Sequence, residues 1–187
     1  PIYSAVGGAH IEFDGDNDYV ELGSIDSSNP ISLANQIEFA VEVWFNLNNT
    51  GDQFQRIVDK SNGGSALNGY SLFVDLNAGN FNHLYFQVNS NSLANVIIPG
   101  LQTGWHQVVV TRDLSNTITT YADNSTVQTN NNAISISSTT TNMRFGSWNH
   151  STGRELNGKI GCIRIYNKHL SPTEITTNYN QLKTRYG

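Results

Sequence analysis

The chain has 187 residues, 37% of them hydrophobic and 13% charged, and its formal net charge is −5. This length and apolar content suffice for one all-β core. The Lys and Arg residues number ten and are scattered, so the basic stripe that nucleic-acid phosphates require is absent and a nucleic-acid partner is excluded. No apolar run approaches the roughly 20 residues that span a bilayer, so we expect no membrane insertion.

Residues 1–8 show no hydrophobic period and contain two glycines. We interpret them as a linker remnant in front of a single domain formed by residues 9–187. The clearest strand follows at residues 36–47. Its odd-numbered positions from Ile37 to Phe45 are apolar, whereas Trp44 lies on the opposite face. That tryptophan is either a binding platform or is covered by another element, and we favour the covered position.

Other short alternating segments are separated by Asn- and Gly-rich turns, which is typical of antiparallel strands. They lie at residues 55–60, 70–76, 83–89, 93–98, 105–112, 117–122, 143–147 and 159–166. We interpret the low-complexity stretch formed by residues 130–132 and 135–141 as a long loop or an edge strand.

Only the end of the chain carries a clear helix signal. Ser171 and Glu174 have the spacing of a capping box, with Pro172 at the first helical position. Ile175 and Tyr179 follow on one face. The predicted fold is therefore an all-β, two-sheet antiparallel sandwich (a jelly roll) with one short C-terminal helix.

The single cysteine excludes an internal disulfide framework. Cys162 lies among isoleucines, and this setting favours a buried, unreactive thiol over a nucleophile.

Four segments resemble a known family when they are taken in order. They are residues 11–20, 39–45, 105–113 and 156–171. Together they resemble laminin-G-like domains of the concanavalin A-like lectin and glucanase superfamily. The ending, residues 170–187, is similar to copies in marine tailed-phage structural proteins. The resemblance implies a jelly roll that binds glycans, in some members with a calcium ion, while the ligand itself must be argued from the site.

The hydrolases of this fold carry three alternating carboxylates along one strand. Here Glu38 and Glu42 occupy the outer two positions, but Ala40 stands where the central carboxylate is required. A straight strand separates the outer Cα atoms by roughly 13 Å, at about 3.3 Å per residue, which is wide for glycoside hydrolysis. We therefore expect no enzymatic activity, and we expect both carboxylates to be solvated or paired with Lys or Arg on a neighbouring strand.

Asp14, Asp16 and Asp18 alternate with small residues and offer the oxygen ligands that calcium prefers. The segment is not an EF-hand, because Tyr19 and Ile25 occupy the positions of its Gly and Glu. Two readings stay open: a structural calcium site, or a turn whose Asp side chains bond the local backbone. Calcium is the only cofactor that the sequence suggests.

Sugar binding needs an aromatic face together with amide or charged groups for the hydroxyls. The loop formed by residues 147–154 offers Trp148, Asn149, His150 and Arg154 between two predicted strands. We predict a ligand site there, at the rim of the sandwich. The alternative places Trp148 beneath the loop as a packing residue.

A second polar and aromatic group includes Lys60, His83 and Tyr85, with His83, Tyr85 and Gln87 on one face of one strand. The sequence thus favours a non-catalytic, lectin-like module that binds a glycan or polysaccharide through the rim loop or the concave sheet. The alternative is a virion surface or adhesion domain whose partner is another structural protein. Either role predicts an extracellular or virion-surface location.

Overall fold

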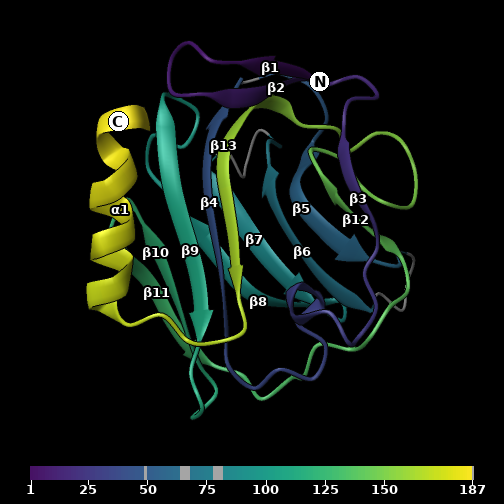
Figure 1. Ribbon diagram of the computed structural model, residues 1–187, viewed down its shortest axis with the longest axis vertical. Helices are drawn as coiled ribbons and strands as arrows, with labels where there is room; N and C mark the ends of the chain where they lie inside the picture. The colour runs from purple at the N-terminus through teal and green to yellow at the C-terminus, as the bar shows by residue number, and fades with distance from the viewer. Residues whose placement is uncertain (49, 64–67, 78–81, 187) are drawn as a thin grey trace.

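The computed structural model describes residues 1–48, 50–63, 68–77 and 82–186. Two antiparallel sheets face one another, which confirms the predicted sandwich (Figure 1). The seven-stranded sheet has the order β1 (Ile2–Ser4), β2 (His10–Asp14), β13 (Asn157–Tyr166), β4 (Phe39–Leu47), β9 (Trp105–Arg112), β10 (Thr117–Ala122), β11 (Ser125–Asn131). The six-stranded sheet has the order β3 (Val20–Ser24), β12 (Asn142–Phe145), β5 (Phe54–Ser61), β6 (Gly69–Asp75), β7 (His83–Val88), β8 (Asn91–Ile97).

The main core lies between the sheets and follows from the alternation of apolar residues. Phe39, Val41, Val43 and Phe45 of β4 are fully buried in it, and β6 and β7 supply residues such as Phe86 from the opposite sheet. Ile37 was predicted to belong to this face, and that prediction is wrong. Strand β4 begins only at Phe39, the first residue that pairs with β9, and Ile37 is 54% exposed.

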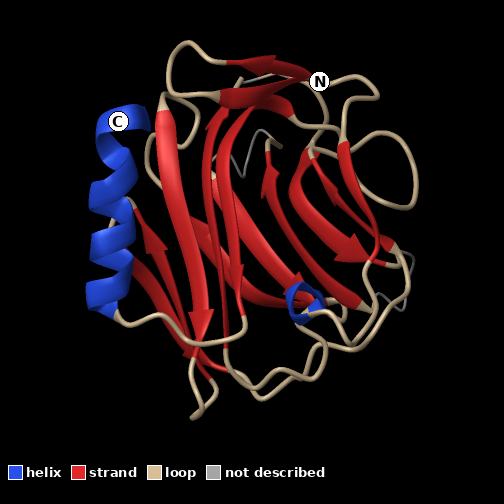
Figure 2. Ribbon diagram, viewed as in Figure 1, coloured by secondary structure: helices blue, strands red, loops and turns tan. Residues whose placement is uncertain are grey.

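The segments without a strong apolar pattern lie at the edges of the sheets. Residues 1–8, interpreted as a linker remnant, supply the short edge strand β1, which pairs with β2. Asn130 and Asn131 lie in the edge strand β11, whereas residues 132–141 form no strand. A short 3₁₀ helix, Pro30–Ser32, precedes β4 (Figure 2).

The helix α1 (Pro172–Tyr186) begins as its capping box predicts. The Glu174 amide donates to Ser171 Oγ at 3.3 Å, and the Ser171 amide donates to a Glu174 carboxylate oxygen at 2.9 Å. The helix packs on the outer face of the seven-stranded sheet (Figure 2). Trp44 is 1% exposed there and stacks on Tyr179 with ring centroids 5.5 Å apart, so the prediction that Trp44 is covered is confirmed. Among the described residues, no helix is long and apolar enough to cross a membrane.

Glu42 connects the same sheet to the helix. Its carboxylate is fully buried and accepts hydrogen bonds from Gln107 Nε2 at 2.8 Å and Asn178 Nδ2 at 2.7 Å. Arg164 Nη1 of the adjacent strand β13 lies 3.3 Å away. Glu42 is therefore paired with an arginine, which is one of the two environments expected for it. Ala40 is buried beside it in a small second core beneath the helix.

Cys162 lies on β13, where a register irregularity follows Ile160. Its side chain is partly buried rather than fully buried. Burial raises the pKa of the thiol, and this disfavours the reactive thiolate, as the prediction of an unreactive cysteine requires.

Candidate ligand-binding face

The outer face of the six-stranded sheet carries the polar and aromatic side chains that the core does not use. Strand register places cross-strand partners on a common face. One row across this face runs through Arg56, Phe73, Tyr85 and Asn95, and the next runs through Asp59, Ser71 and Gln87. We call these seven residues, together with Phe54 and His83, the outer face.

The aromatic rings of the outer face stack in a line along neighbouring strands. Phe73 and Tyr85 are nearly parallel, with ring centroids 5.1 Å apart and an interplanar angle of 9°. His83 stacks on Tyr85 at 6.1 Å, and its Nδ1 lies 3.0 Å from Asn95 Oδ1. At the other end, the Arg56 guanidinium lies 3.8 Å above the Phe73 ring. This line combines ring faces with side-chain hydrogen-bonding groups.

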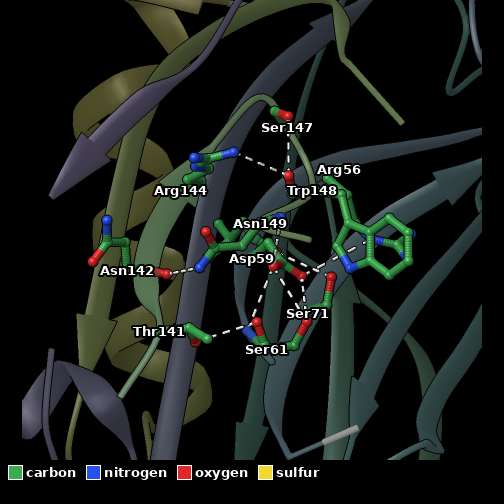
Figure 3. Close-up of polar contacts among 11 residues, drawn as sticks. Arg56, Asp59, Ser61, Ser71, Thr141, Asn142, Arg144, Ser147, Trp148 and Asn149 are labelled. Carbon is green, nitrogen blue, oxygen red and sulfur yellow. Dashed lines mark hydrogen bonds and ion pairs between the residues drawn. The ribbon is translucent and has the colours of Figure 1, made fainter. Parts of the chain in front are cut away.

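The loop formed by residues 147–154, the rim loop, folds over the β5 end of the outer face. The Trp148 ring lies 4.0 Å from the Arg154 guanidinium and 6.0 Å from that of Arg56. Arg144 of β12 donates to the Trp148 carbonyl at 3.3 Å (Figure 3). Trp148 is half-buried, so its side chain is packed against arginines and is neither a free platform nor a core residue.

Asp59 fixes the rim loop to the sheet. Its carboxylate is fully buried and accepts hydrogen bonds from the Asn149 amide at 3.2 Å and the Ser61 hydroxyl at 2.9 Å (Figure 3). Burial raises the pKa of Asp59, and burial lowers the pKa of Arg56 to about 9, although each charge favours the other. The Arg56 Nε atom lies 4.0 Å from Asp59 Oδ1, at the limit of an ion pair.

A small open pocket lies on the other side of the rim loop. It has a volume of about 290 Å³, and its lining includes Asn149 and His150 of the loop and Tyr19 and Arg144 from the adjacent strand edges. The Arg144 guanidinium lies 4.1 Å from the Tyr19 ring and bonds Glu21 at 2.7 Å. The rim loop thus presents its tryptophan to the outer face and its next residues to this pocket.

The family follows from a match over most of the chain. A family model described as the concanavalin A-like lectin/glucanases superfamily, of the laminin-G type, matches residues 14–176. The chain belongs to this superfamily. A search of curated protein sequences finds no match.

Solved structures similar to this superfamily domain agree on the fold. The binding domain of botulinum neurotoxin serotype D/C has a TM-score of 0.71 at 16% identity, over 96% of this chain and 45% of that one. The CBM40 domain of Ruminococcus gnavus IT-sialidase has a TM-score of 0.65 at 12% identity, over 91% and 96% of the two chains. A botulinum neurotoxin type C structure, whose description ties cell entry to two ganglioside molecules, has a TM-score of 0.60 at 14% identity, over 95% and 52%. The chain therefore spans about half the length of the toxin domains that it matches.

The two candidate sites predicted from the sequence adjoin in the structure. Rim-loop residues Trp148 and Arg154 contact the outer face, which continues through Phe73 to Tyr85 and His83. Asn149 and His150 line the neighbouring pocket.

Lys60 lies apart from this group. It pairs across the strands with Tyr70, a core residue, and its ammonium donates to the carbonyls of Thr139 at 2.9 Å and Thr141 at 2.6 Å. Lys60 therefore ties down residues 139–141 from the inner side of β5.

Sequence reasoning missed Arg56, Asp59 and Phe73, the residues that join the two sites. Phe73 looks like a core residue in the sequence, although it faces outward and is covered by Arg56. The usable signal was the presence of the charged residues Arg56 and Asp59 within the predicted strand at residues 55–60; both are buried in the structure.

The Asp14–Asp18 segment forms the backbone hydrogen bonds of a turn. The Asp16 amide donates to Asp14 Oδ1 at 2.9 Å, and the Asp14 amide donates to Asp18 Oδ2 at 3.2 Å. Within the described ranges, no group of three His, Cys, Asp or Glu side chains is arranged to hold a metal ion. The donor set therefore fits the turn better than a calcium site, and calcium stays a prediction.

Proposed function

We propose that the domain is a non-catalytic carbohydrate-binding module whose ligand lies on the outer face, beside the rim loop. The main observation behind this proposal is the line of stacked rings that runs from His83 to Phe73. At its Phe73 end, the line adjoins the rim-loop residues Trp148 and Arg154. Aromatic faces pack against the C–H side of a sugar ring, and amide and guanidinium groups bond its hydroxyls.

Two further facts support this proposal. Relatives of the same fold include a CBM40 domain and a toxin domain associated with gangliosides. The strand that carries catalytic carboxylates in hydrolases of this fold is covered here, since Glu42 is fully buried beneath α1 and bonded on several sides. Glycoside hydrolysis requires two carboxylates that reach the substrate. A glycan ligand also favours an extracellular or virion-surface location.

The test is a glycan array probed with the native chain, once with calcium and once with a chelator. We expect binding that falls at least about tenfold in Trp148→Ala, because Arg154 loses the ring against which its guanidinium packs at the rim of the site. Tyr3→Ala is the matched control. Tyr3 is 68% exposed on β1, in the other sheet, so its removal should leave binding unchanged.

Four outcomes lead to different conclusions. Absence of glycan binding in both conditions would refute the proposal and favour the alternative, a virion or adhesion domain with a protein partner. Binding that survives Trp148→Ala in a folded variant would place the ligand elsewhere. Binding lost with chelator would support a calcium ion at the ligand site, whereas a lower melting temperature with retained binding would indicate a structural ion.

A further inference from the structure

Two guanidinium groups lie beside the Trp148 ring, those of Arg56 and Arg154, and both have donors that no described residue accepts. Arg154 lies over the rings of Trp148 and Phe54, at 4.0 and 5.4 Å. No described residue accepts a hydrogen bond from its guanidinium. Arg56 is 1% exposed, and its Nε and Nη1 atoms are buried without a hydrogen-bond partner. Buried donors that stay unpaired lower stability, so the two unpaired donors of Arg56 require an explanation.

The neighbouring carboxylates do not provide it. Asp59 is occupied by the Asn149 amide and the Ser61 hydroxyl. Glu155 accepts the amides of Gly153 and Arg154, both at 2.8 Å, and Asp52 accepts the amide of Glu155 at 3.0 Å. These acids hold the loop backbone in place. Asp59 also lies 4.0 Å from Arg56 Nε, at the limit of an ion pair, but none of the three carboxylates accepts a hydrogen bond from either guanidinium group.

A guanidinium that packs against an aromatic ring has fewer orientations open to it, and its planar fork can bind a carboxylate with two hydrogen bonds. Arg154 is partly exposed next to the outer face, so it can reach a ligand directly. Arg56 lies behind it, against Phe73 and Trp148, and adds positive charge in a setting where water screens little. The chain as a whole has a net charge of −5. The two arginines therefore form a local positive site and are not part of a generally basic surface.

We propose that the ligand is an acidic saccharide and that its carboxylate is received by Arg154, with Arg56 as the positioning charge. This inference rests on the proposed function and specifies the ligand class of the same site. The hydroxyl and C–H faces of the sugar would lie along the outer face towards Tyr85. A neutral glycan of the same shape offers Arg154 hydroxyl oxygens as acceptors but no negative charge and no bidentate partner.

The experiment compares galacturonic acid oligomers with their methyl esters, which keep the size and hydroxyl groups but remove the charge. Isothermal titration gives the affinities, and the Nε–H resonance of Arg154 in NMR reports direct contact. We expect the native chain to bind the acid at least about tenfold more tightly than the ester. Added salt should reduce that difference.

The variant Arg154→Gln should abolish the preference for the acid while ester binding persists. Lys183→Gln is the matched control: it removes one positive charge from exposed Lys183 on α1, on the opposite side of the sandwich, and should preserve the preference. Arg154→Lys should fall between the native chain and Arg154→Gln, since the charge remains without the planar fork.

The outcomes separate the two proposals. Equal binding of acid and ester that still depends on Trp148 would overturn the acidic-ligand inference and leave the glycan module intact. Glycan binding on the array confined to sulfated or neutral sugars would also overturn the inference. Loss of all glycan binding would defeat the proposed function and this inference with it.

Discussion

The buried carboxylate of Glu42 offers a quantitative test of how α1 is held on the sheet. Its replacement in Glu42→Ala leaves Gln107 Nε2 without its acceptor and Arg164 without its partner. Asn178 Nδ2 loses its shorter hydrogen bond and keeps only the one to the Tyr166 hydroxyl oxygen at 3.1 Å. Removing one member of a buried ion pair costs about 3–5 kcal/mol. Because the Arg164 side chain is 28% exposed and regains water, the lower end, about 3 kcal/mol, applies.

A domain of 187 residues loses about 2–4 °C of melting temperature per kcal/mol, so the expected drop is about 6–12 °C. Circular dichroism measures this drop, and tryptophan fluorescence follows Trp44, which stacks on Tyr179 of the helix. Glu42→Gln keeps one acceptor oxygen and should fall in between.

The matched control for Glu42 is Glu38, the carboxylate that lies just before the start of β4. Glu38 is half-buried and forms none of the hydrogen bonds or ion pairs found among the described residues. Glu38→Ala should change the free energy of unfolding by less than about 0.5 kcal/mol. If Glu42→Ala also stays within 1 kcal/mol of the native chain, on the scale of a single exposed contact, the buried network does not hold the helix and the reasoning is refuted.

Two other predictions address stability at separate places. The hydrogen bond to Asp123 raises the pKa of His106, so it stabilises the protein fully below the unfolded value of about 6.5 and less as pH rises through the higher folded pKa. Melting temperatures between pH 5.5 and 8.5 should therefore decline more for the native chain than for His106→Gln, and equal slopes would contradict this assignment. Gly146 has φ +83°, and an added Cβ would lie 2.3 Å from Phe13. Gly146→Ala should cost about 2–5 kcal/mol in urea unfolding, from backbone strain plus overpacking. Gly153→Ala should cost about 1–2 kcal/mol, since Gly153 has φ +89° with no atom within 4 Å; similar losses in both variants would count against the steric clash.

The elements that bury one face were predictable, and those that do not were missed or left open between a loop and an edge strand. Strand β4 and the helix α1 carry an apolar period and a capping box, and both lie where the sequence places them, apart from the first residues of the strand. Strands β3 and β11 are largely exposed, so they have no hydrophobic alternation to detect. Their pairing depends on neighbouring strands that are distant in sequence.

The residues of the candidate site in the rim loop and in β7 were predicted from the sequence, but those in β5 were not, because β5 contains a bulge. In a regular strand, Arg56, Val58 and Lys60 would share one face by simple alternation. The register shifts between Arg56 and Val58, so Arg56 and Asp59 face outward while Lys60 faces inward. One extra residue in a strand reverses the faces of all that follow. This explains why Lys60 was grouped with the ligand residues and Asp59 was not.

The helix α1 makes the domain one-sided. It occupies the outer face of one sheet (Figure 1). The rim-loop residue Arg154 instead contacts Phe54 of the other sheet. A tether or support joined to the solvent-exposed side of α1 would therefore turn every ligand face in the same direction. If the domain binds a polysaccharide as proposed, copies displayed in this way on a surface would hold it at many points at once, and weak individual contacts would add up to durable attachment.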